Sequence, residues 1–301
     1  MGEVIEAPQK ATEVKAWLAA HANPDPAVLL PIPKQKASAK VAAVRALGAI
    51  GGPAAFEVLS QYASDGKYSD AMLKELHVAW GAFDRHDFAA TMFNSRVLRL
   101  GMTTNVTGLD AVADLCALDI IVPKSLDLAP LAACQNLREL NILVYDSGTL
   151  DLSFLEELPC LEHLDLANLS KQTNLAPLAH TSLKSLCLPL DGQAGDVLLQ
   201  IDSLERLQVS GGVQKADHSS ADPSDVDPGL IDVVVRLVQR GVSVVTYRHE
   251  KSWVPRLVET AAAAGLFSTE SNGYVGLTND AAEINGLERR MFNNHVTGLY
   301  L

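Results

Sequence analysis

The chain has 301 residues, with 36 acidic against 24 basic side chains and a formal net charge of −12. Nucleic acids and anionic membrane surfaces bind basic protein faces, so this balance argues against both as partners. The sequence begins without a secretory signal and has no run of about 18 apolar residues that could cross a membrane, so we expect a cytoplasmic protein.

Residues 1–94 are predicted to form a HEAT-like helical region. A short helix is expected over 11–20, and four prolines prevent a helix in the connector 23–34. Helical hairpins follow at 38–64 and 69–93, where apolar residues recur at the three- and four-residue spacing of a buried helix face. Two helix pairs about 30 residues apart are typical of HEAT repeats, so we expect them to form an N-terminal α-helical cap.

The first of these hairpins has a recognisable turn. Gly51 and Gly52 stop its first helix, and Pro53 suits the first turn of the second. Tyr62 and Trp80 fall on the apolar faces of their helices, and we expect them in the core rather than at a contact surface.

A phrase of the form L-x-x-L-x-L recurs through the middle of the chain. Its five clear copies start 22, 24, 22 and 21 residues apart, and VLRL at 97–100 is a worn first copy. A period of about 20–29 residues with this phrase is typical of leucine-rich repeats. We therefore predict an α/β solenoid, with a leucine-rich repeat array over 95–212. The copies are LCALDI (115–120), LRELNI (137–142), LEHLDL (161–166), LKSLCL (183–188) and LERLQV (204–209).

Each copy is expected to contribute one strand. Alternate side chains of a strand point to opposite faces, so the leucine pair points into the solenoid and the residues between point outward to a concave face. The phrase that follows, such as LAPLAAC, turns back on the convex side as a short helix or 3₁₀ turn. One repeat buries too little apolar surface to fold alone, so the copies must stack, with their strands paired in parallel.

One feature of many such repeats is missing. An Asn three residues after the last strand leucine commonly bonds the loop backbone. Other groups must satisfy the turns in this chain. The corresponding places hold Pro123, Tyr145, Leu169, Asp191 and Gly212.

Residues 213–301 are predicted to form a small C-terminal α/β cap. The polar stretch 211–229 is typical of an exposed loop. A helix and a strand are expected in 230–248, a helix in 254–267 and another around 280–292. The first helix and strand also suit an enlarged last repeat, which a variable element would follow.

The sequence lacks common catalytic motifs. It has neither a G-x-x-x-x-G-K-[ST] phosphate loop nor G-x-S-x-G, and HEKSW at 249–253 lacks the second histidine of a zinc protease. The four cysteines have no C-x-x-C spacing, so we expect reduced structural thiols. We predict no enzyme, no cofactor and no metal centre. The alternative is an enzyme in the C-terminal region, with a cleft lined by His249, Glu250 and Asp280.

The outward strand positions form columns whose neighbouring members are about 4.8 Å apart. We predict that this concave face binds a protein partner through a polar cluster with an apolar anchor beside it. The alternatives are a metal site made by Glu139, His163 and Asp165, or a solvated face that only keeps the array soluble. Trp253 is either an exposed aromatic contact or a buried cap residue. The candidate partner-binding residues are Asp119, Ile121, Glu139, Asn141, Leu143, His163, Asp165, Ser185, Arg206, Gln208 and Trp253.

The order of a helical region and leucine-rich repeats resembles the sensor half of bacterial NACHT-type STAND ATPases, the prokaryotic relatives of NOD-like receptors. In that family a HEAT-like stretch with the phrase elxxAWxxFdxxxfA leads into leucine-rich units. The resemblance spans about 38–210. The phrase is matched by Glu75, Leu76, Ala79, Trp80, Phe83, Asp84, Phe88 and Ala89.

This resemblance implies a module that senses an invader in anti-phage defence by binding a protein ligand of phage origin. Binding would be coupled to oligomerisation through the family's NACHT ATPase motor, which is expected in the same chain. No Walker motif lies in these residues, so the sequence corresponds to a fragment or a stand-alone sensor. The alternative is a constitutive protein-binding scaffold or inhibitor of the leucine-rich-repeat type, unrelated to defence.

Overall fold

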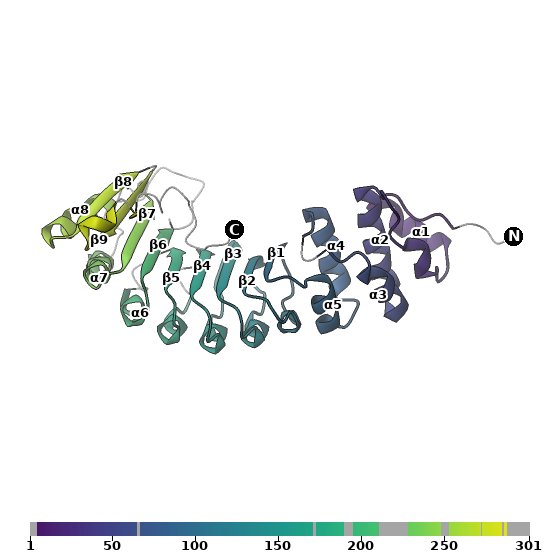
Figure 1. Ribbon diagram of the computed structural model, residues 1–301, viewed down its shortest axis with the longest axis horizontal. Helices are drawn as coiled ribbons and strands as arrows, with labels where there is room; N and C mark the ends of the chain where they lie inside the picture. The colour runs from purple at the N-terminus through teal and green to yellow at the C-terminus, as the bar shows by residue number, and fades with distance from the viewer. Residues whose placement is uncertain are drawn as a thin grey trace. The chain divides into compact units, whose positions relative to one another are not determined.

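Figure 1 shows the computed structural model of the chain, which describes residues 5–64, 67–170, 173–189, 195–210, 228–247, 253–271, 273–284 and 286–287. The chain divides into two compact units, Met1–Leu115 and Cys116–Leu301. The predicted domain boundaries after residues 94 and 212 stay predictions.

The first unit is mainly helical, and one strand lies near its C-terminal end. Both predicted hairpins form, as α2–α3 and α4–α5, and the helix predicted over 11–20 begins as a 3₁₀ turn. The worn repeat copy forms β1, whose Leu98 and Leu100 are buried. Assignment of the helix pairs to HEAT repeats stays a prediction. The elements are η1 (Ala11–Glu13), α1 (Val14–Ala20), η2 (Pro26–Leu29), α2 (Ala37–Ile50), α3 (Gly52–Ser60), α4 (Asp70–Trp80), α5 (Arg85–Met92), β1 (Val97–Met102) and η3 (Leu109–Ala111), where η denotes a 3₁₀ helix.

The turn between α2 and α3 uses the glycines as predicted. Gly51 and Gly52 adopt φ values of +68° and +77°, which glycine reaches without the strain that a Cβ would impose. Gly48 has a different role, because a Cβ at this position would lie 2.9 Å from Ala79 Cβ. The missing side chain therefore lets α2 and α4 approach closely.

The residues that carry the family resemblance have packing roles in α4 and α5. Trp80 is fully buried, and its Nε1 donates a hydrogen bond to the Arg85 carbonyl at 2.9 Å. Its ring stacks on Phe88, with centroids 6.2 Å apart. Asp84 is the N-cap of α5, where its Oδ1 accepts two backbone N–H bonds at 3.0 Å. The phrase therefore specifies how two helices join.

A charged pair ties three elements of the first unit together. Glu75 on α4 is 4% exposed. Arg45 on α2 donates from Nε to Glu75 Oε2 at 2.7 Å, and a second bond joins its Nη2 to Glu75 Oε1. The remaining Nη1 donates to the Ala11 carbonyl at 2.9 Å. The bidentate bond satisfies a carboxylate that would be costly to bury alone.

The second unit is the repeat array with a C-terminal extension. Its strands lie in the order β2-β3-β4-β5-β6-β7-β9-β8, parallel from β2 to β7 and antiparallel in the last two pairs. Figure 1 shows β2–β6 along one side of the array and short helical turns along the other. The elements are β2 (Ala117–Pro123), η4 (Ala129–Ala133), β3 (Glu139–Gly148), η5 (Ser153–Glu157), β4 (His163–Leu169), η6 (Ala176–His180), β5 (Ser185–Pro189), α6 (Gly195–Gln200), β6 (Arg206–Ser210), α7 (Pro228–Gln239), β7 (Ser243–Tyr247), α8 (Val254–Ala263), β8 (Phe267–Ser271), β9 (Tyr274–Thr278) and η8 (Ala281–Glu283).

The repeat leucines stack in register as predicted. One ladder of paired residues crosses the sheet from β2 to β7, and each of its members is at most 1% exposed. Each leucine is covered by the equivalent residues of its neighbours, so the core is shared between repeats. The ladder consists of Leu118, Leu140, Leu164, Leu186, Leu207 and Val244.

Asx side chains hold the turns that lead into the 3₁₀ helices, four to six residues beyond the places where the Asn was expected. Asp127 and Asp151 each accept a hydrogen bond at 2.9 Å from the backbone N–H two residues later, and Asn174 accepts one at 3.1 Å. The N–H of Ser153 lowers the pKa of Asp151 below its ordinary value, because it bonds the charged form. These residues open η4, η5 and η6, so the backbone turns are satisfied on the helical side of each repeat.

A repeated backbone joint fixes the start of each strand. The carbonyls of Cys116, Arg138, Glu162 and Lys184 each accept two consecutive N–H groups from the start of the next strand, at 2.8–3.0 Å. The Glu205 carbonyl accepts from the Ser243 N–H at 2.9 Å, which extends the series to β7. Register is therefore set by main-chain bonds as well as by the leucines.

The C-terminal extension is described in part. The helix and strand predicted in 230–248 form as α7 and β7, and α8 ends before Gly265, whose φ is +75°. The loop predicted over 211–229 lies outside the described residues up to position 227, and its last two residues instead begin α7. The helix predicted around 280–292 begins as the 3₁₀ helix η8 and is α-helical at 284 and 286–287, whereas residue 285 and the residues from 288 onward lie outside the description.

Replacing a ladder leucine should destabilise the second unit. Leu164→Ala leaves a cavity between two covered neighbours, and we expect the free energy of unfolding to fall by about 2–5 kcal/mol in urea denaturation followed by circular dichroism. Leu143→Ala on the outer side of β3 is the control, with little expected loss because its side chain is 36% exposed. Equal losses for the two variants would contradict the shared-core interpretation.

The Arg45–Glu75 pair should show strong coupling. Arg45→Met leaves the Glu75 carboxylate buried without its cation, which should lower the free energy of unfolding by about 2–3 kcal/mol. Adding Glu75→Leu removes that stranded charge, so we expect the double variant to be more stable than Arg45→Met alone. A double variant as unstable as the sum of the single ones would show that the two side chains act independently.

Candidate functional site

The outer face of the β2–β6 sheet, away from the 3₁₀ helices, is the predicted concave face, and we call it the strand face. His163 is the register partner of Glu139 on one side and Ser185 on the other. Asn141 lies in the same way between Asp119 and Asp165. The three columns of register partners run Ala117, Glu139, His163, Ser185, Arg206, then Asp119, Asn141, Asp165, Cys187, Gln208, and lastly Ile121, Leu143, Ala167.

An apolar strip, made of Ile121, Pro123, Leu143 and Tyr145, lies on β2 and β3. Leu143 pairs in register with Ile121, and Tyr145 with Pro123. Leu143 is 36% exposed and Tyr145 is 56% exposed. In the described part of the second unit, the other exposed large apolar side chain is Phe267 on β8, so these side chains concentrate on the strand face.

Beside the strip, Glu139, His163 and Ser185 form a polar row across β3, β4 and β5. Each has one buried atom without a hydrogen-bond partner among the described residues: Glu139 Oε2, His163 Nδ1 and Ser185 Oγ. Leaving a buried polar atom unpaired costs about 1–3 kcal/mol. The described residues therefore leave three buried polar atoms beneath the strand face without a hydrogen bond.

The charge on this part of the face is mainly negative. Carboxylates at Asp119, Glu139 and Asp165 lie on β2, β3 and β4, whereas the cation of the same columns, Arg206, lies on β6. Over the ranges that the structure describes, no group of three or more His, Cys, Asp or Glu side chains is placed to hold a metal ion. The alternative of a metal site at Glu139, His163 and Asp165 thus has no geometric support.

A row of alternating charges borders the polar row at the start of the strands. Arg138, Glu162, Lys184 and Glu205 occupy equivalent positions in successive repeats. Lys184 Nζ bonds Glu162 Oε1 at 2.9 Å, which lowers the pKa of Glu162 and raises that of Lys184. These groups are exposed, so the pair adds little stability, but it fixes the charge pattern at this edge.

The structure corrects two predicted contacts and adds one. Trp253 is 3% exposed at the N-cap of α8, so it is a buried residue of the extension rather than an exposed aromatic contact. Ser185 is 1% exposed, because its short side chain lies between the longer His163 and Arg206 in the register. Tyr145 is exposed two residues beyond Leu143, a position that continued strand alternation would have identified.

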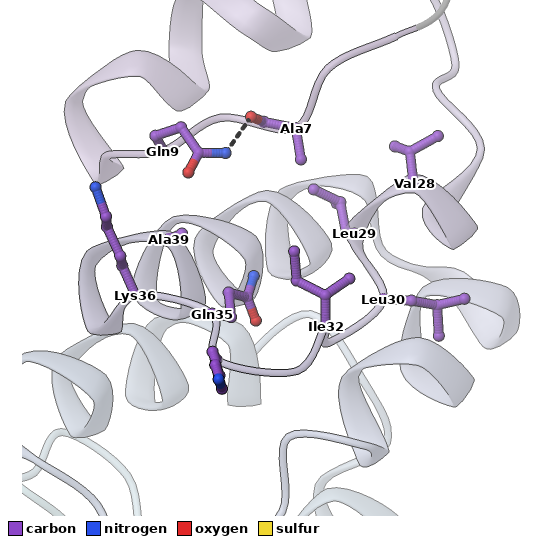
Figure 2. Close-up of a pocket in the computed structure, with 10 residues that line it drawn as sticks. Ala7, Gln9, Val28, Leu29, Leu30, Ile32, Gln35, Lys36 and Ala39 are labelled. Atoms are coloured by element: carbon purple, nitrogen blue, oxygen red, sulfur yellow. Dashed lines mark hydrogen bonds between the residues drawn. The ribbon is translucent and has the colours of Figure 1, made fainter.

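A small pocket of about 220 Å³ lies in the first unit (Figure 2). Leu29 and Ala39 are buried in its lining, and Ile32 is 64% exposed. Gln9 Nε2 donates to the Ala7 carbonyl at 3.0 Å, as the dashed line shows, so one of its two N–H donors is already engaged. This volume is below the roughly 300–1,000 Å³ of typical small-molecule pockets. The remaining lining residues are Val28, Leu30, Lys34, Gln35 and Lys36.

The described residues give no geometric support to the alternative of an enzyme in the C-terminal region, with a cleft lined by His249, Glu250 and Asp280. His249 and Glu250 lie outside the described residues. Asp280 is the N-cap of η8, where its Oδ1 accepts from the Ala282 N–H at 2.8 Å. This contact gives Asp280 a structural role. Among the helices that the structure describes, none is long and apolar enough to cross a membrane.

Comparison with known proteins gives a structural likeness at low sequence identity. No protein-family model and no curated protein matches the sequence. An internalin, InlF of Listeria monocytogenes str. 4b F2365, is 17% identical, with a TM-score of 0.36 over 67% of this chain. The chain spans 62% of the length of that internalin. The leucine-rich-repeat architecture therefore rests on this chain's own period, register and burial.

Removing the unpaired hydroxyl of the polar row should stabilise the chain. Ser185→Ala leaves no buried Oγ to desolvate, so we expect the free energy of unfolding to rise by about 1 kcal/mol. Ser203→Ala is the matched control, because Ser203 Oγ donates to the Leu183 carbonyl at 2.8 Å and its loss should lower stability. Urea denaturation of both variants measures the difference, and a destabilised Ser185→Ala would show that Oγ has a partner.

Proposed function

We propose that this chain is a protein-recognition module and that its strand face contacts the partner. The observation that carries the proposal is the exposure of Leu143 and Tyr145 on β3, beside the polar row, while the repeat leucines are buried. Exposed apolar groups that a polar frame surrounds are typical of interaction sites. The parallel backbone joints keep these side chains on a rigid surface.

The predicted contacts follow this arrangement. The apolar strip is the anchor, and the residues of the polar columns give specificity, because their charges and polar groups favour a partner of complementary chemistry. The proposed contact residues of both kinds are Asp119, Ile121, Glu139, Asn141, Leu143, His163, Asp165, Arg206 and Gln208. Tyr145 joins this set because it is exposed on the apolar strip.

The finer proposal is that the module is the sensor part of a NACHT-type bacterial immune receptor in anti-phage defence. It is supported by the resemblance of residues 75–89 and by the order of helical and leucine-rich regions. In this proposal the ligand is a phage protein, and the helical unit joins the sensor to an ATPase motor. The alternative is a constitutive scaffold or inhibitor that binds a cellular protein.

The proposal is tested by capture of a partner on the immobilised chain from lysates of phage-infected and uninfected bacteria, with mass spectrometry. Leu143→Asp should reduce capture at least tenfold, since it puts a charge into the apolar anchor. Phe267→Asp is a matched control, because Phe267 is 40% exposed on β8, away from the strand face, and should leave capture unchanged.

The outcomes separate the two functions. A partner that is captured only after infection supports the sensor, and one captured equally from both lysates supports the scaffold. Capture that survives Leu143→Asp but fails with Phe267→Asp would place recognition elsewhere and remove the strand-face assignment. Melting temperatures of both variants check that each remains folded.

A further inference from the structure

We infer that the strand face takes a basic segment of the partner, with an arginine side chain over Glu139 and a large apolar side chain on the apolar strip. The inference rests on the proposed function, in which the strand face is the recognition surface. The inference adds the chemical class of the bound segment, which is basic and carries a large apolar side chain.

Charge favours a cationic occupant over β2, β3 and β4. Asp119, Glu139 and Asp165 fall within two strand spacings of one another, about 10 Å, on one face. The cation of these columns, Arg206, lies two strands beyond Asp165. Such a potential attracts a basic partner and disfavours an acidic one.

The polar row is what distinguishes this place from an ordinary solvated acidic surface. Ser185 is 1% exposed, and its Oγ has no hydrogen-bond partner in the described part of the chain, which also holds for Glu139 Oε2 and His163 Nδ1. All three atoms can accept a hydrogen bond, His163 Nδ1 in the tautomer that carries its proton on Nε2. The hydroxyl of Ser185 and the ring of His163 can each also donate, so the carboxylate of Glu139 is the acceptor-only member of the row.

A guanidinium group is suited to an acceptor-only carboxylate such as that of Glu139. It carries five N–H donors and no acceptor, and its planar fork can pair both oxygens of a carboxylate. Lysine offers the same charge without this fork, so it satisfies a carboxylate with less geometric specificity. Glu139 is half-buried at the start of β3, so its side chain is partly accessible to such a group, although Oε2 is buried.

The spacing along β3 gives the pattern of the ligand. Glu139 and Leu143 face the same side, four residues apart, which corresponds to about 13 Å along a strand. A partner segment in extended conformation spans this distance with the same number of residues. The expected segment therefore carries arginine and a large apolar residue separated by three positions.

The test uses nine-residue peptides selected from a random display library on the immobilised full chain. The most enriched peptide is resynthesised with arginine replaced by citrulline, which keeps the shape and removes the charge. Fluorescence anisotropy then measures the affinity of both peptides for the chain and for Glu139→Gln. We expect selected peptides to be enriched in arginine, and citrulline or Glu139→Gln to weaken binding by about tenfold or more.

The two changes should not add, because both remove the same contact. Glu156→Gln, at an exposed carboxylate of η5, is the matched control and should leave affinity unchanged. Melting temperatures show whether Glu139→Gln remains folded.

Peptides without arginine enrichment, or unchanged affinity with citrulline, would overturn the inference. If Leu143→Asp still abolishes peptide binding in that case, the strand face remains the recognition surface and only the basic ligand is excluded. If Leu143→Asp also leaves binding intact, the proposed function fails as well. A dimer in sedimentation velocity that Glu139→Gln dissociates would instead identify a second copy of the chain as the occupant.

Discussion

The contact of each repeat leucine with its counterparts in the neighbouring repeats is what makes this array possible. Leu140, Leu164 and Leu186 are fully buried, although each repeat supplies only a short strand and a 3₁₀ turn. A single repeat has two open flanks and cannot offset the entropy of ordering its backbone. The shared ladder closes those flanks, so the strand face is rigid because of contacts made on the opposite side of the sheet.

The period of the sequence was sufficient to predict the register of the strand face. The L-x-x-L-x-L phrase fixes which side chains point inward, so Glu139, His163 and Ser185 could be aligned before any coordinates. Exposure was harder to predict, because it depends on residues from other parts of the chain. Trp253 shows this limit, since the same polar surroundings suited an exposed aromatic or a buried cap residue. The Asx turns were missed because they lie in the convex phrase, which varies more than the strands.

The family resemblance and the candidate site lie on different parts of the molecule. Trp80, Asp84 and Phe88 pack or cap helices of the first unit, so the phrase that contains them encodes architecture. The polar row and the apolar strip lie in the second unit, at positions where the repeat pattern allows any residue. The resemblance of residues 75–89 thus concerns how the helices are joined. The chemistry of the ligand must be inferred from the outward residues of the strands.

The doubled hydrogen bonds at the start of each strand have a consequence for how such a surface evolves. Cys116, Arg138, Glu162 and Lys184 make this joint with carbonyl oxygens, which every amino acid has. Substitutions other than proline at the outward positions consequently leave alignment of the strands intact. Specificity can drift from one binding target to another under selection, one side chain at a time, without a compensating change in the scaffold.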